Sequence, residues 1–139
     1  MYEMLNYNIR GCEVDSNPSL REWIDIVMED TCDCLNNFTE EDWKKLLEEL
    51  PNKSTIWKKR FNDCLYDFES PYKIPALLIM ANTDDEKLFI DVIKNLANCD
   101  LNNIENIDAL NAKVEMMMAK ASTDSNRSVL ENFLKKKRI

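Results

Sequence analysis

The stretch "WKKLLEELPNKSTIWKKRF", residues 43–61, decides the fold expected for this chain. It contains Trp-Lys-Lys twice, at Trp43 and Trp57, with the breaker Pro51-Asn52 between the two copies. Apolar residues recur at helical spacing on both sides, and a proline ends a helix because it cannot donate the next hydrogen bond. Each Trp is then the first large buried residue of its helix. The short connection predicts two antiparallel helices that pack side by side.

The amino-acid composition extends the helical prediction to the whole chain. The 139 residues include one glycine and four prolines, too few for the tight turns of a β-sandwich or a doubly wound sheet. Apolar residues make up 45% and charged residues 32%, which is typical of a globular domain. We therefore expect an all-α fold in one domain, residues 1–139.

About seven helices are expected, in stacked antiparallel hairpins with degenerate, HEAT-like repeats. Residues 1–18 are expected to be an irregular N-terminal segment. A buried stripe of the third helix is predicted at Ile56, Trp57, Phe61, Cys64, Leu65 and Phe68, and a capping box at Thr83 to Glu86. Capping and breaker residues place the helices at about 19–36, 40–50, 55–68, 73–82, 84–98, 106–121 and 123–137.

The net charge of −8 is concentrated in the first third of the chain. Residues 1–50 contain 13 acidic and 4 basic side chains, whereas residues 51–139 contain 13 acidic and 14 basic ones. Such a negative field repels nucleic acid and anionic lipid, and it speeds association with basic protein surfaces. We therefore expect a basic protein as partner, and neither nucleic acid nor a membrane.

The candidate contact residues are carboxylates on the first two predicted helices. Along the first helix they recur at i, i+3, i+7 and i+11, so they share one face. Like charges at such spacing cost roughly a few tenths of a kcal/mol per pair, and a basic partner would remove that cost. A merely solvated face and a partner-binding surface both remain open. The stripe is Glu22, Asp25, Glu29, Asp30 and Asp33, extended by Glu41, Glu48 and Glu49.

Catalysis and metal binding are not expected. The chain has no histidine, the commonest general base and neutral metal ligand. Cys32 and Cys34 are two residues apart, a spacing that points side chains in different directions on a helix, whereas zinc sites favour Cys-x-x-Cys. We expect ordinary thiols at all five cysteines, no cofactor and no enzyme activity.

The cytoplasm is the expected location. The start MYEMLNYNIRGCE lacks the apolar segment of a secretory signal, and no apolar run approaches the length of a membrane span. Five cysteines are an odd number, which favours reduced thiols over a disulfide framework.

The central segment, about residues 39–97, resembles the helical, HEAT-like immunity proteins of contact-dependent growth inhibition and related polymorphic bacterial toxin systems. The shared pattern is a Leu-Pro turn, a Trp-Lys-x-Arg helix start, a short apolar helix and a capped Thr/Ser-Asp-Asp-Glu helix. The matching residues are Leu50-Pro51, Trp57-Lys58-Lys59-Arg60, Leu77-Leu78-Ile79 and Thr83 to Glu86.

The resemblance implies a cytosolic protein that binds the C-terminal domain of one cognate toxin in a 1:1 complex. Such toxins are often nucleases, either RNases or DNases, and carboxylates can occupy a phosphate-binding groove. The family implies no catalytic residues. Two alternatives stay open: a helical adaptor without a toxin partner, and a small helical enzyme that would need a bound metal or cofactor.

Overall fold

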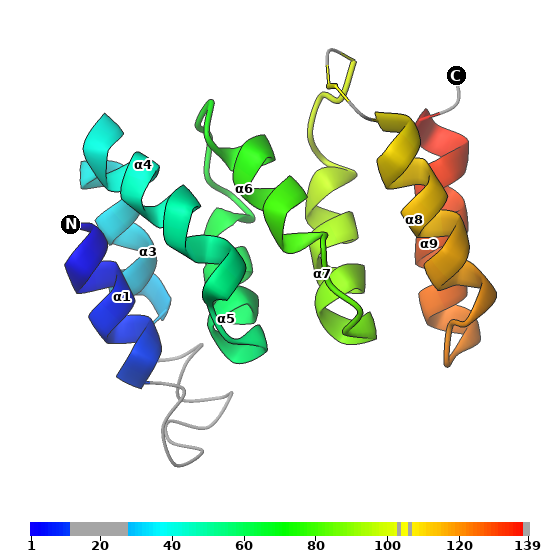
Figure 1. Ribbon diagram of the computed structural model, residues 1–139, viewed down its shortest axis with the longest axis horizontal. Coiled ribbons are helices and arrows are strands. Elements are labelled where there is room, and N and C mark those ends of the chain that lie inside the picture. The colour runs from blue at the N-terminus through cyan, green and yellow to red at the C-terminus, as the bar shows by residue number, and fades with distance from the viewer. Residues whose placement is uncertain (12–27, 103, 106, 138–139) are drawn as a thin grey trace. The chain divides into compact units, whose positions relative to one another are not determined.

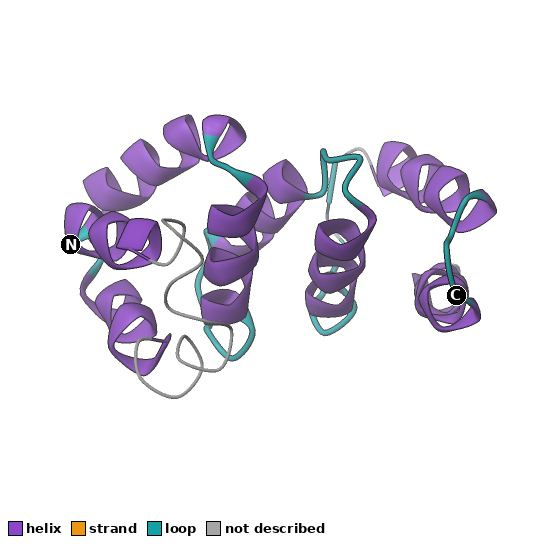
Figure 2. Ribbon diagram, turned by 90° about the horizontal axis from the view of Figure 1, so that it is seen from below, coloured by secondary structure: helices purple, strands orange, loops and turns teal. Residues whose placement is uncertain are grey.

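The computed structural model describes residues 1–11, 28–102, 104–105 and 107–137. Within these ranges the chain forms eight α-helices and no strand, which confirms the all-α prediction (Figure 2). The contacts group the residues into two compact units, Met1–Ile79 and Met80–Ile139. Each unit is described by itself, and the single domain of residues 1–139 stays a prediction.

The first unit contains both helices predicted from residues 43–61 (Figure 1). Its elements in chain order are α1 (Tyr2–Gly11), α3 (Met28–Asp33), the 3-10 helix η3 (Cys34–Asn37), α4 (Glu40–Glu49), the 3-10 helix η4 (Leu50–Asn52) and α5 (Thr55–Leu65). Helix α6 (Lys73–Met80) follows α5 and ends at the boundary between the units.

Helix α1 corrects the prediction that residues 1–18 are irregular. Tyr2, Leu5 and Ile9 follow one another at helical spacing, and all three are buried. They form the inner face of α1, which packs against α3, α4 and α5. Tertiary packing therefore stabilises a helix too short to be stable alone. Residues 12–18 of the predicted segment, and the predicted helix start at 19–27, lie outside the described residues.

Local capping signals fix the start of α4 and α5, as the sequence predicted. The Thr39 hydroxyl accepts from the Asp42 backbone N–H, and the Ser54 hydroxyl accepts from the Trp57 backbone N–H. Trp43 and Trp57 are both buried at the first turn of their helices. Ile56 was wrongly assigned to the buried stripe, because it lies one residue before Trp57 on a different face and is 45% exposed.

The second unit consists of α7 (Glu86–Leu96), α8 (Ile107–Ala119) and α9 (Asp124–Lys137). Helix α9 packs against both α7 and α8. The inner face of α7 is made of buried apolar residues: Leu88, Phe89, Val92, Ile93 and Leu96.

The N-cap of α7 is Asp85 and not Thr83, which corrects the predicted capping box. The Asp85 carboxylate accepts from the Leu88 backbone N–H at 2.9 Å, while the Thr83 hydroxyl accepts from the Asp85 backbone N–H at 3.2 Å. Glu86 instead reaches the turn between α8 and α9, where it accepts from the Ser122 backbone N–H at 2.7 Å. The helix starts at Glu86 because the Asp85 carboxylate caps its first turn.

Candidate functional site

An acidic pocket of about 340 Å³ lies between α3 and α5 in the first unit. Four carboxylates line it, two from α3 and two from α5 and the turn after it, and no Lys or Arg is among the described residues that line it. A recess of this charge fits a cationic group. We call this recess the acidic pocket, and its nine lining residues are Met28, Glu29, Cys32, Asp33, Asn36, Asp63, Cys64, Asp67 and Phe68.

Helical spacing explains why these carboxylates meet. Glu29 and Asp33 are four residues apart on α3 and share one face of it, and Asp63 and Asp67 have the same spacing at the end of α5. Helix α5 ends at Leu65, so Asp67 stands in the following turn. Because α3 packs against α5, the two acidic pairs face the same space.

Of the six predicted contact residues that the structure describes, two line the acidic pocket. These are Glu29 and Asp33, both exposed. Asp30 is exposed beside them, and its backbone carbonyl accepts from the Cys34 thiol at 3.6 Å. Glu22 and Asp25 lie outside the described residues. Glu41 and Glu48 are exposed on α4 and are not among the described residues that line the pocket.

The sequence prediction missed Asp63 and Asp67. The available signal was their spacing of four residues, which brackets Cys64 and precedes Phe68 in the predicted buried stripe. Phe68 is half-buried and packs against Trp43, with 6.0 Å between ring centroids. It therefore gives the acidic pocket an apolar wall held in place by the core.

Glu49, predicted as a contact residue, interacts with side chains of its own unit. Its carboxylate lies 4.0 Å from the Lys53 ammonium and next to the buried Tyr2 hydroxyl. Burial, followed by the charge of Glu49, raises the pKa of Tyr2 to about 12. Glu49 is thus engaged by α1 and the α4–α5 connection inside the unit.

Asn6 joins α1 to the same connection. Its side-chain oxygen accepts from the Trp57 indole N–H and from the Lys53 ammonium, each at 2.9 Å. Lys53 also lies over the Trp57 ring at 5.0 Å and the Tyr2 ring at 5.6 Å. One amide oxygen therefore satisfies the buried indole and holds the cation in place.

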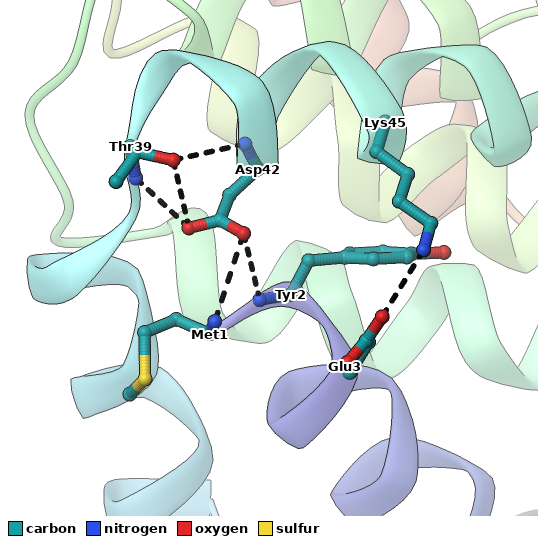
Figure 3. A network of polar contacts seen from close by, with 6 residues as sticks. All are labelled: Met1, Tyr2, Glu3, Thr39, Asp42 and Lys45. Atoms are coloured by element: carbon teal, nitrogen blue, oxygen red, sulfur yellow. Dashed lines mark hydrogen bonds and ion pairs between the residues drawn. The ribbon is translucent and has the colours of Figure 1, made fainter.

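Asp42 fastens α1 to the start of α4 (Figure 3). One carboxylate oxygen accepts from the Thr39 backbone N–H at 3.0 Å and the Thr39 hydroxyl at 3.1 Å. The other accepts from the Tyr2 backbone N–H at 3.4 Å and pairs with the Met1 ammonium at 3.6 Å. The Thr39 backbone hydrogen bond is the main cause that lowers the pKa of Asp42.

The exposed cation next to this network also has its partner in α1. Lys45 pairs with Glu3 at 3.2 Å (Figure 3). Within the described ranges, no group of three or more Cys, Asp or Glu side chains could hold a metal ion. No helix of the described chain is long and apolar enough to cross a membrane.

Comparison with known proteins gives one partial similarity. No protein-family model matches the chain, and no solved structure matches it. The chain is 33% identical over 104 residues to the tRNA modification GTPase MnmE of Prochlorococcus marinus (strain MIT 9301). This match covers 70% of the chain but 22% of that protein. The phosphate-binding loop G-x-x-x-x-G-K-[ST] needs two glycines, and Gly11 is the sole glycine here.

Proposed function

We propose that this protein is an immunity protein that binds and neutralises a cognate toxin domain, a basic nuclease, by covering its active site. The observation that supports this function is the acidic pocket, where Glu29 and Asp33 meet Asp63 and Asp67. A nuclease presents basic side chains to phosphate, and carboxylates can take the place of the phosphate groups. The complex is 1:1 and cytoplasmic, with no cofactor, nucleic acid or membrane.

The charge of the first unit adds to this proposal. Met1–Ile79 contains 16 acidic and 9 basic side chains, a net −7, whereas Met80–Ile139 contains 10 acidic and 9 basic ones, a net −1. A field of this size draws a basic partner toward the first unit. In the acidic pocket, Met28 and Phe68 can cover the aliphatic stem of a partner's Lys or Arg while the carboxylates bind its charged end.

A helical adaptor without a toxin partner is the second candidate. It is favoured by apolar side chains left exposed on α1, where Met4 is 54% and Tyr7 is 78% exposed. Such residues are enriched at protein–protein interfaces. An adaptor would bind a partner through α1, so its binding would not depend on the acidic pocket.

Affinity capture from native cells, with charge-reversed variants, tests the proposed function. The tagged wild type is expected to recover the C-terminal region of a large secreted protein in a 1:1 ratio, and to inhibit that region's nuclease activity. The double variant Glu29→Lys with Asp33→Lys is expected to bind at least tenfold more weakly, about 1.4 kcal/mol, because it places two cations against the basic partner.

The matched control is Glu105→Lys with Asp124→Lys, which changes the net charge equally at exposed sites of the second unit. It is expected to keep nearly full affinity and inhibition. If both double variants bind as tightly as the wild type, the interface lies elsewhere. Capture of an unrelated cytosolic protein, insensitive to the pocket charges, would favour the adaptor.

A further inference from the structure

Two thiols from different helices meet in the wall of the acidic pocket. Cys32 of α3 is half-buried, Cys64 of α5 is buried, and both are reduced. The two helices pack against each other, and the side chains of Cys64 and Cys32 interact in the wall that they share. A disulfide needs its sulfurs about 2.05 Å apart, and two thiols on facing helices in one wall can be joined without moving a distant part of the chain.

We propose that Cys32 and Cys64 form a reversible disulfide that fixes α3 against α5 and locks the wall of the acidic pocket. This inference stands apart from the immunity function, because it concerns the protein alone. Its co-reactant is a small-molecule disulfide such as glutathione disulfide. The outcome is a covalent link between the two helices that carry Glu29, Asp33 and Asp63.

The reaction is two successive thiol–disulfide exchanges. The Cys32 thiolate attacks one sulfur of glutathione disulfide, which breaks the S–S bond and releases one glutathione. The Cys64 sulfur then attacks the Cys32 sulfur of the mixed disulfide and releases the second glutathione. Two protein thiols are oxidised, one glutathione disulfide is reduced, and the two thiol protons end on the two glutathiones.

The geometry selects this pair and this order. Cys34, two residues from Cys32, points in a different direction and donates to the Asp30 carbonyl. The hydrogen bond to Cys32, together with burial, raises the pKa of the Cys64 thiol, so Cys64 stays protonated while Cys32 reacts first. Cys99 belongs to the second unit.

Peptide mapping of the oxidised full-length protein tests the proposal. Reduced protein is incubated with glutathione disulfide, the remaining thiols are alkylated, and the chain is cut before aspartates. Cleavage before Asp33 separates Cys32 from Cys34. The expected product links residues 30–32 to residues 63–66, with loss of two of the five thiols and full recovery on adding dithiothreitol.

Single variants identify the two partners. Cys99→Ser is expected to keep the link, whereas Cys32→Ser and Cys64→Ser are each expected to abolish it while circular dichroism remains helical. If Cys64→Ser fails to fold, Cys32→Ser decides, because its side chain is only half-buried. Recovery of all five thiols from the folded wild type, or a link through Cys12 or Cys34, would overturn the proposal.

Discussion

At the scale of single residues, side chains on α1 explain features of α4 and α5 that neither helix explains alone. Trp57 is fully buried, and its indole N–H has its acceptor 51 residues earlier, at Asn6. A buried donor without a partner destabilises a fold more than a typical hydrogen bond stabilises it. The contribution of Asn6 therefore lies mainly in preventing an unsatisfied donor.

Asn6→Ala is expected to lower the free energy of unfolding by about 1–3 kcal/mol, because it leaves the buried indole N–H of Trp57 and the Lys53 ammonium without their shared acceptor. Urea denaturation followed by Trp fluorescence measures the change. The control Asn52→Ala removes an exposed amide from the same unit and should cost less than about 0.5 kcal/mol. Equal effects of the two substitutions would show that Asn6 does not hold the indole.

Asp42 is expected to make stability depend on pH in the acid range. Folding lowers the pKa of the Asp42 carboxyl below its ordinary value of 3.8. Its contribution to the free energy of unfolding is therefore present above about pH 4 and is lost as the pH falls through the lowered pKa. The stability difference between the wild type and Asp42→Asn should therefore be largest near neutral pH and should shrink toward about pH 2.5.

Thermal denaturation at a series of pH values measures this difference. Glu48→Gln removes an exposed carboxylate from the same helix and should change stability by less than about 0.5 kcal/mol. A gap between wild type and Asp42→Asn that stays constant down to about pH 2.5 would mean that ionisation of Asp42 does not support the fold.

At the scale of elements, the start of α4 is a reciprocal capping box between Thr39 and Asp42. Thr39→Ala should destabilise the protein by about 1 kcal/mol, because it leaves the Asp42 backbone N–H without its side-chain acceptor. Thr55→Ala is the matched control, since Thr55 is exposed and the cap of α5 is its neighbour Ser54. Chemical denaturation compares the two variants, and a larger loss at Thr55 would contradict the capping role.

Signals local to one helix could be predicted from the sequence, and signals from tertiary packing could not. Thr39 and Ser54 start their helices by contacts within four residues, and the helix starts at residues 40 and 55 were predicted. Helix α1 depends on distant partners, because its buried face packs against α3, α4 and α5. Propensity and capping patterns contain no information on such partners.

The same division applies to the candidate site. Glu29 and Asp33 could be paired from the sequence because their spacing places them on one helix. Asp63 and Asp67 join them only because α5 packs against α3, which residue spacing does not specify. Glu49 was assigned to the partner surface, yet it pairs with Lys53 and acts on Tyr2 in its own unit.

At the scale of the whole molecule, the net −7 of Met1–Ile79 bears on how fast a partner arrives. If the proposed function holds, the association rate with the basic toxin domain should fall at least tenfold between about 0.05 and 0.5 M KCl, while the dissociation rate changes less. Stopped-flow kinetics measures both rates. An association rate that does not change with salt would exclude electrostatic steering by this unit.

The shared amide of Asn6 also constrains how this sequence can change over evolutionary time. Because one oxygen serves both Lys53 and Trp57, a chain that loses the amide at position 6 gains stability by also replacing the indole with a side chain that needs no acceptor. We therefore expect positions 6, 53 and 57 to covary among diverged homologues. Joint substitution at these three positions would identify a relative even where all the charged surface residues differ.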